Sequence, residues 1–224
     1  MWHLHHFSLC AFSRKIRLVL AEYRLDFDLI SVRPWDAEPD FIAMNPAGLT
    51  PVLTSDEDER VLSDSGAIFE YLSAQYADDV SLLGDTDLTA AEARRLAAWF
   101  DVKFYTEVTA YAFAEKVAKR FITKAPPNAK AVRAASHNLK THLDYIEHLF
   151  ARRSWLAGDR FTIADIAAAA HISIIDYLGM IDWSAHSGAQ DWYARLKSRP
   201  SMRPILADRM PGLKPAPHYD QLDF

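Results

Sequence analysis

The first eighty positions alternate between two hydrophobic periods. Short apolar runs bounded by turn residues predict strands, whereas apolar residues spaced three and four apart predict helices. The predicted order is strand, helix, strand, short helix, strand, strand, helix. These elements span Leu4–Phe7, Ser13–Glu22, Phe27–Ser31, a helical turn near Pro39–Met44, Val52–Ser55, Arg60–Leu62 and Ser65–Gln75.

After position 80 the strand pattern disappears and only helical spacing remains. Thr89 and Glu92 fit a capping box at the start of the first long helix. Thr162 and Asp165 fit a second box, in which we expect Asp165 to have a structural role. The predicted helices are Thr89–Phe121, Asn128–Arg152, one that begins after Thr162, Gly188–Ser198 and Pro200–Ala207.

These patterns predict two domains and a tail. Residues 1–80 form an α/β domain, residues 81–88 a linker, residues 89–210 an all-helical domain, and residues 211–224 a proline-rich extended tail. The longest apolar segment, Ile163–Ile181, contains Asp165 and Asp176. Such carboxylates indicate a buried core helix, so we expect no membrane insertion.

Composition narrows the class of function. The 224 residues are half apolar and a quarter charged, which is typical of a globular protein. The net charge of −5, with acidic residues spread along the chain, argues against nucleic acid as the main partner. The first residues lack the basic and apolar regions of a signal peptide, so we expect a cytoplasmic protein.

Cysteine and histidine usage bears on disulfides and metals. The single cysteine excludes an internal disulfide. Strand periodicity would place His3 and His5 on one face, near His6 in the chain, but no Cys, Asp or Glu completes a ligand set there. We therefore expect no metal site.

The segment Asn-Pro-Ala-Gly-Leu-Thr-Pro-Val-Leu at positions 45–53 is the most informative motif. Proline lacks an N–H for the ladder and rarely precedes a strand directly, while Gly48 gives the turn freedom in φ. A cis Thr50–Pro51 bond would account for both, and would turn the Thr50 backbone toward a ligand. Asp64 and Ser65 then begin a helix, where free N–H groups suit a carboxylate.

The order and spacing of these pieces resembles the glutathione-binding half of the glutathione S-transferases. The resemblance implies a thioredoxin-like N-terminal domain joined to an all-helical C-terminal domain. It implies glutathione as a ligand, held through Thr50, Pro51, Asp64 and Ser65. It implies no tightly bound cofactor.

Cys10 and Ser13 lie where the first strand gives way to the first helix. Free N–H groups and the helix dipole favour a thiolate at such a position. The C-x-x-S spacing resembles cysteine-type members of the family, whose cysteine forms a mixed disulfide with glutathione. In other members a serine, here Ser13 or Ser8, hydrogen-bonds the glutathione sulfur, and Ala11 departs from the proline common at its position. The alternative for Cys10 is a small buried apolar residue.

The family resemblance also implies a homodimer. Most soluble homo-oligomers are two-fold dimers with a self-complementary contact. We expect that contact on the first long helix, through Trp99, Phe100 and Phe104.

The C-terminal tail is too apolar for a disordered end, and its prolines favour an extended path. We expect it to pack on the body of the protein or on a partner. The ending resembles an alphaproteobacterial branch of the family whose members bind FtsZ filaments and promote their curvature during constriction. The tail residues that carry this resemblance, and a predicted partner contact, are Pro217, His218, Tyr219, Leu222, Asp223 and Phe224.

Two functions are therefore open. The first is a division regulator without catalysis that acts at the division site through FtsZ, with Arg94-Arg95, Lys116–Lys124 or Arg195–Arg209 as basic surface. The second is an active glutathione S-transferase or glutathione-dependent thiol transferase, with Cys10 as nucleophile or Ser13 as thiolate stabiliser.

Overall fold

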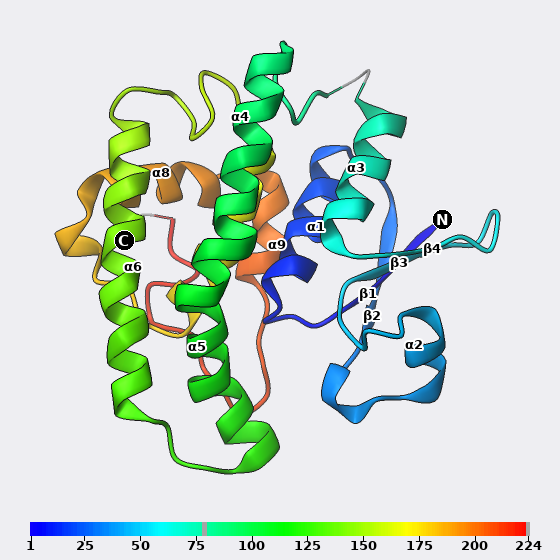
Figure 1. Ribbon diagram of the computed structural model, residues 1–224, viewed down its shortest axis with the longest axis horizontal. Coiled ribbons are helices and arrows are strands. Elements are labelled where there is room, and N and C mark those ends of the chain that lie inside the picture. The colour runs from blue at the N-terminus through cyan, green and yellow to red at the C-terminus, as the bar shows by residue number, and fades with distance from the viewer. Residues whose placement is uncertain (78–79, 223–224) are drawn as a thin grey trace. The chain divides into compact units, whose positions relative to one another are not determined.

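A four-stranded mixed sheet organises the first of two units in the computed structural model (Figure 1). The structure describes residues 1–77 and 80–222, and its units are Met1–Leu82 and Leu83–Phe224. The strand order is β2-β1-β3-β4. β1 pairs parallel with β2 and antiparallel with β3, and β3 pairs antiparallel with β4. The strands are β1 (Trp2–His6), β2 (Phe27–Ser31), β3 (Val52–Ser55) and β4 (Val61–Ser63).

Helices cover both faces of this sheet. Helices α1 and α3 pack against each other on one side, and α2 lies on the other side (Figure 1). Leu4, Val52 and Leu53 are fully buried at the sheet centre, as their apolar character requires. The thioredoxin-like order predicted from the sequence is confirmed. The helices are α1 (Ala11–Glu22), α2 (Pro39–Met44) and α3 (Ser65–Tyr76), with a short 3₁₀ turn at Pro34–Asp36.

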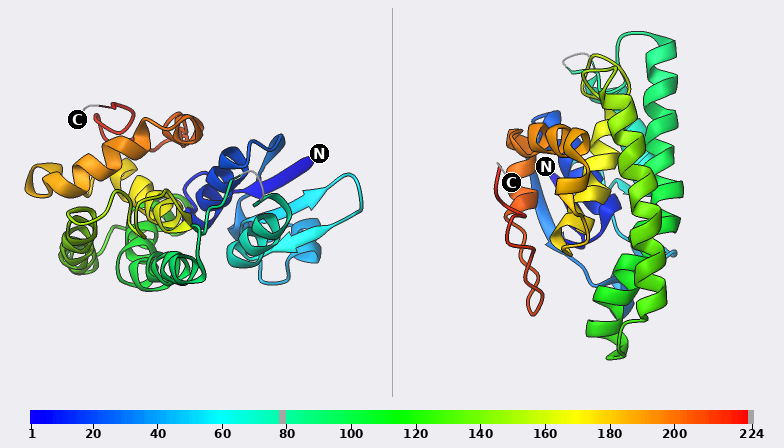
Figure 2. Two further views of the ribbon diagram at one scale, coloured as in Figure 1. Left: turned by 90° about the horizontal axis from the view of Figure 1, so that it is seen from above. Right: turned by 90° about the vertical axis from the view of Figure 1, so that its left-hand side faces the viewer.

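Within the described residues, the regular elements of the second unit are all helices, apart from isolated bridges at Trp155–Gly158 and Met210–Leu213. A long rod runs through α4 (Asp87–Ala98), a π-helical segment Trp99–Thr109, α5 (Ala110–Phe113) and a second π-helical segment Ala114–Thr123. The rod runs beside α6 (Ala129–Phe150), which packs on its first π-helical segment (Figure 2, right). The remaining helices are α7 (Ile163–Tyr177), α8 (Ser187–Lys197) and α9 (Arg203–Leu206), with 3₁₀ turns at Trp183–Ala185 and Pro200–Met202.

The start of α4 corrects one prediction. The capping box consists of Thr86 and Thr89, not Thr89 and Glu92. Thr86 has the extended backbone of an N-cap residue, and its hydroxyl accepts from the Thr89 N–H. Glu92 instead accepts hydrogen bonds from Arg95 and Arg153. The helix therefore begins one turn earlier than its hydrophobic pattern indicates.

Helix α7 forms the core of the second unit, and every one of its residues is buried. The predicted capping box is confirmed: Thr162 accepts from Ala164 N, and Asp165 accepts from Thr162 N. Asp165 also accepts from the Leu156 N–H and the Trp192 indole, both at 3.0 Å. Burial raises the pKa of Asp165 to about 6, and these donors oppose that rise. Among the described residues, no helix combines the length and hydropathy needed to cross a membrane.

Candidate functional site

One end of the sheet gathers the three pieces of the predicted glutathione site. His5 pairs with Val52, so the end of β1 lies beside the start of β3. Val52 pairs with Ser63, so Asp64 follows at the same end as Pro51. Because β3 is antiparallel to both neighbours, the β1–α1 loop, the Thr50–Pro51 bond and the start of α3 meet at this edge.

Cys10 is the N-cap residue of α1 and is half-buried. Its Sγ lies 3.5 Å from the Thr50 carbonyl oxygen, to which the thiol donates. The thiol thus lies between a helix N-terminus, which favours the thiolate, and the proline turn. The structure brings Cys10 and Thr50 together as the resemblance implies. Their roles toward glutathione stay predictions.

The loop that presents Cys10 is held from within α1. The Ser13 hydroxyl is buried and accepts from the Phe7 N–H at 3.3 Å, and Arg14 Nε donates to the Ser8 carbonyl at 2.8 Å. Ser13 therefore stabilises the loop, whatever it does toward a ligand sulfur. The role of Arg14 could not be predicted from the sequence, because a cationic residue in a helix does not indicate which carbonyl it will bind.

The Thr50–Pro51 peptide bond is cis, as predicted. The turn before it is fixed by Asn45, whose Nδ2 donates to the Leu49 carbonyl at 2.8 Å and whose Oδ1 accepts from Ala47 N. Gly48 follows with φ at +64°, a conformation that favours glycine. The Asn45 side chain is buried and takes the part of a backbone turn. Asn-Pro in the sequence is the signal that could have identified this role.

Asp64 caps α3. Its Oδ1 accepts from the N–H groups of Gly66 and Ala67 at 2.7 and 3.1 Å, and its backbone has φ at +71°. A Cβ at Gly66 would lie 3.0 Å from the same oxygen, so glycine allows the close approach. Ser65, the first residue of α3, is buried. One Asp64 oxygen is thus engaged by its own helix, and binding of a ligand by Asp64 and Ser65 stays a prediction.

A second constellation holds the C-terminal tail on the helical unit. Asp176 Oδ1, inside α7, lies 2.8 Å from His218 Nε2 and accepts from the Trp183 indole at 2.9 Å. Lys197 Nζ donates to the carbonyls of His218 and Gln221 at 3.1 and 3.0 Å, and lies 3.6 Å from Asp176 Oδ2. Lys197 and Asp176 are fully buried. Burial lowers the pKa of Lys197, and the Asp176 carboxylate opposes this shift.

Tyr219 anchors the tail by its ring. The side chain is fully buried, stands edge-on to Tyr177 with ring centroids 5.0 Å apart, and donates to the Ile205 carbonyl at 3.0 Å. Of the other predicted tail residues, Pro217 and Leu222 are exposed. Asp223 and Phe224 lie outside the described residues. The tail up to position 222 therefore packs on its own body and offers only part of its surface to a partner.

A basic cavity of about 650 Å³ lies beside the tail. The Lys116 ammonium donates to the Leu178 carbonyl at 3.0 Å, and burial lowers its pKa. Among the described residues that line the cavity, Glu115 is the one carboxylate. It is paired with Lys119 at 2.7 Å, and this pairing keeps its pKa low. The cationic residues that line the cavity are Lys116, Lys119, Arg120, Lys124 and Lys214.

The expected dimer contact needs correction. Phe100 and Phe104 are fully buried inside the helical unit, where Phe104 stacks edge-on with His142 and His171. They cannot meet a second chain. Trp99 is half-buried, and its indole donates to His142 Nδ1 at 3.1 Å. On the same rod, Leu88 and Val102 are exposed by 81 and 63 %.

Comparison with known proteins agrees with this architecture. The glutathione S-transferase N-terminal domain model matches residues 4–79, and the C-terminal domain model matches residues 129–195. FtsZ-localized protein A of Caulobacter vibrioides is 47% identical over 223 residues, which cover 99% of this chain and 97% of that protein.

Solved structures give the same picture. FzlA from C. crescentus has a TM-score of 0.96 and 47% identity, covering 100% of this chain and 99% of that one. A glutathione S-transferase from Rhodospirillum rubrum F11 has a TM-score of 0.96 and 46% identity, covering 100% of both chains. A glutathione S-transferase of Methylobacillus flagellatus, solved with glutathione bound, shares the fold at 24% identity and a TM-score of 0.76, covering 92% of this chain and 98% of that one. The chain described here belongs to the glutathione S-transferase family.

Proposed function

We propose that this chain is a glutathione-transferase-like cell-division regulator that binds FtsZ filaments at the division site and promotes their curvature, without catalysis. The observation that carries the proposal is the 47% identity with FtsZ-localized protein A over 99% of the chain. The matched residues extend into the C-terminal tail, whose sequence resembles that of FtsZ-binding members of the family.

The basic cavity supports an acidic partner. Among the described residues of its wall, five are cationic and the carboxylate of Glu115 is already paired. The wall therefore has an excess of positive charge, although the chain carries a net charge of −5. Clustered charge of one sign steers a partner of the opposite sign and fixes its orientation. The cavity and the exposed parts of the tail, Pro217 and Leu222, form the surface that we assign to FtsZ.

Co-sedimentation with GTP-assembled FtsZ tests this assignment. The variant R120E/K124E reverses two charges of the cavity wall, and K140E reverses an exposed charge on α6 outside it. We expect R120E/K124E to pellet poorly and K140E to pellet like the parent protein, with the difference larger at low salt. Equal pelleting of all three would exclude the cavity, and no pelleting of the parent protein would exclude FtsZ binding.

The tail needs point variants rather than truncation. Removing the chain after Lys214 would uncover Tyr177 and leave the buried Lys197 without its two tail carbonyls. The double variant P217A/L222A alters only exposed tail side chains. We expect it to keep the thermal stability of the parent protein and to bind FtsZ filaments more weakly.

The second candidate function is glutathione-dependent thiol exchange or glutathione transfer. It is favoured by the position of the Cys10 thiol, 3.5 Å from the Thr50 carbonyl and at the start of α1. The C10S variant tests this function. Cys10 is replaced and Ser13 is kept, because the Ser13 hydroxyl also supports the loop. Glutathione calorimetry and a mixed-disulfide assay on the parent protein and C10S test the form of this function in which Cys10 is the nucleophile. That form requires glutathione binding by the parent protein and loss of exchange in C10S.

The family expectation of a homodimer is part of the proposal. We assign the contact to the exposed apolar residues of the rod, Leu88 and Val102. Sedimentation velocity should give a dimer for the parent protein and a shift toward monomer for V102E. A parent protein that sediments as a monomer at all concentrations would exclude this assembly.

A further inference from the structure

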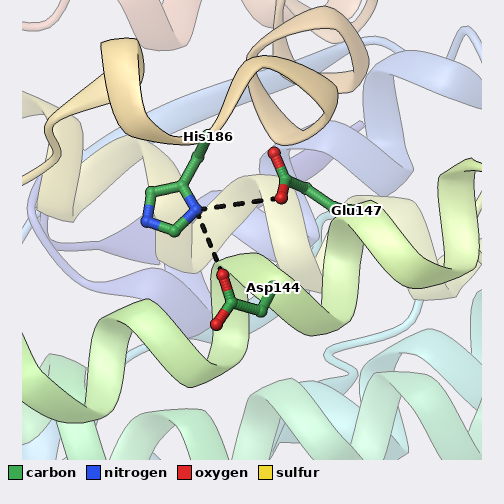
Figure 3. A group of neighbouring side chains, drawn as sticks. All are labelled: Asp144, Glu147 and His186. Carbon is green, nitrogen blue, oxygen red and sulfur yellow. Dashed lines mark ion pairs between the residues drawn. The ribbon is translucent and has the colours of Figure 1, made fainter.

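Three side chains of the helical unit converge outside the two constellations described above. Asp144 and Glu147 lie on one face of α6, three residues apart, and His186 is the N-cap residue of α8, which packs on α6 (Figure 3). One ligand atom from each lies within 4.8 Å of the others. The proposed function does not use this group.

The geometry points to a site for a divalent transition-metal cation, and we propose that Asp144, Glu147 and His186 bind one, with Zn²⁺ as the metal that fits best. His186 Nδ1 lies 3.3 Å from Asp144 Oδ1 and 4.0 Å from Glu147 Oε2. Tetrahedral zinc with bonds of about 2.1 Å holds its ligand atoms about 3.4 Å apart. One pair already has this spacing, and a small rotation of the carboxylates would bring the third atom in.

His186 is the residue that requires a ligand. Its side chain is 6 % exposed, and within the described part of the chain Nδ1 has no hydrogen-bond partner. Asp144 Oδ1 lies near enough for an ion pair but outside hydrogen-bond geometry. Buried polar atoms are normally satisfied, so a nitrogen that faces two carboxylates without a hydrogen bond is suited to bind a cation shared with them.

Glu147 is oriented by the outer contacts that metal ligands usually have. Its Oε1 accepts from the Gly188 N–H at 3.0 Å and from the Ala189 N–H at 3.4 Å, which leaves Oε2 facing His186. A Cβ at Gly188 would lie 3.3 Å from Glu147 Cγ, so glycine gives the glutamate room to approach α8. The start of α8 thus fixes one oxygen and frees the other.

Charge and access fit a dication. Two carboxylates and a neutral imidazole carry a net charge of −2, which Zn²⁺ neutralises. Nitrogen and oxygen ligands suit zinc and its first-row neighbours better than Ca²⁺ or Mg²⁺, which prefer oxygen alone. Asp144 has 66 % of its side chain exposed, so the ion can enter from solvent and water can complete its coordination. The bound metal would tie α6 to the start of α8.

Calorimetric titration with zinc chloride tests the site on the full chain, freed of any affinity tag and stripped of metal. The key variant is H186N, because asparagine is a favoured N-cap residue and keeps the start of α8. H137N removes an exposed histidine on α6 outside the cluster and serves as the matched control. Co²⁺ absorption in the visible range reports directly on the ligand field.

We expect one zinc per parent chain with micromolar or tighter affinity. H137N should retain it, and H186N should weaken it by roughly a hundredfold or more, because even outer-shell changes cost ten- to a hundredfold. E147Q, which keeps the acceptor for Gly188, and D144N, which alters an exposed side chain, should each weaken it at least tenfold.

Two results would overturn the proposal. One is the absence of zinc binding by the parent protein. The other is equal binding by the parent protein and H186N, which would place the zinc at other histidines. If H186N fails to fold, judged by circular dichroism, D144N carries the same comparison.

Discussion

Asp64 combines two local demands in one residue. Its backbone has φ at +71°, which few side chains tolerate, and its Oδ1 accepts two N–H groups at the start of α3. Replacement by alanine should cost about 1–2 kcal/mol in the free energy of unfolding. Asparagine keeps the acceptor and tolerates the left-handed region, so D64N should lose less. Urea unfolding of both variants measures the difference, and equal losses would mean that the cap contributes little.

Single residues also mark what the sequence could predict of the site. The proline turn, Cys10 and Asp64 follow from local rules, because turns, helix starts and caps depend on neighbours in the chain. Asn45 and Arg14 were missed as supports of these loops, since each holds a backbone carbonyl that only the folded loop presents. The cluster of Asp144, Glu147 and His186 was missed because two helices distant in sequence bring it together.

At the scale of elements, the start of α7 depends on the Asp165 carboxylate, which accepts three N–H groups. One donor belongs to the first turn of the helix, and two come from other segments. Asp165 accepts from Leu156, Thr162 and Trp192. In D165N the side chain keeps only one acceptor oxygen. Its NH₂ group takes the place of the other oxygen and faces an N–H donor. The unsatisfied donor should cost about 1–3 kcal/mol. Chemical denaturation measures this, with T162S as a control that keeps the hydroxyl.

Ion pairs between elements predict a pH dependence. Hydrogen bonds from Arg95, followed by those from Arg153, lower the pKa of Glu92 from 4.5 to about 2. A depressed folded pKa adds stability above the unfolded value, and this stability is lost as the pH falls from about 4.5 toward 2.

The E92Q variant removes that contribution. Its unfolding free energy should fall less steeply than that of the parent protein as the pH is lowered through this window. D191N, which neutralises an exposed carboxylate on α8, should follow the parent curve. Parallel curves for the parent protein and E92Q would contradict the assignment of the low pKa to the two arginine contacts.

Element boundaries show why sequence patterns reach only part of the fold. The order of strands and helices follows from hydrophobic period alone, because each face of the sheet must be buried. The start of α4 was misplaced by one turn, since Thr86 and Thr89 form a box without an acidic partner. The π-helical widening of the rod at Trp99–Thr109 and Ala114–Thr123 has no signal in that period either.

At the scale of the whole molecule, the tail is part of the helical unit through buried charges. Lys197 donates to two tail carbonyls and lies 3.6 Å from Asp176, which also holds His218. Breaking one partner of a buried pair typically costs 3–5 kcal/mol because a charge is left alone, whereas removing both partners costs much less. Stability and tail docking can therefore be separated by the choice of variant.

The K197M variant should lose on the order of 3 kcal/mol and release the tail. Adding D176N removes the stranded charge, so K197M/D176N should regain much of the stability. It cannot restore the donors to His218 and Gln221 carbonyls, so hydrogen exchange at the Tyr219 and Gln221 amides should stay faster than in the parent protein. Slow tail exchange in the double variant would mean that Tyr219 packing alone holds the tail. Fast exchange together with normal FtsZ pelleting would show that FtsZ binding does not need the docked tail. The proposed binding surface would then be reduced to the basic cavity.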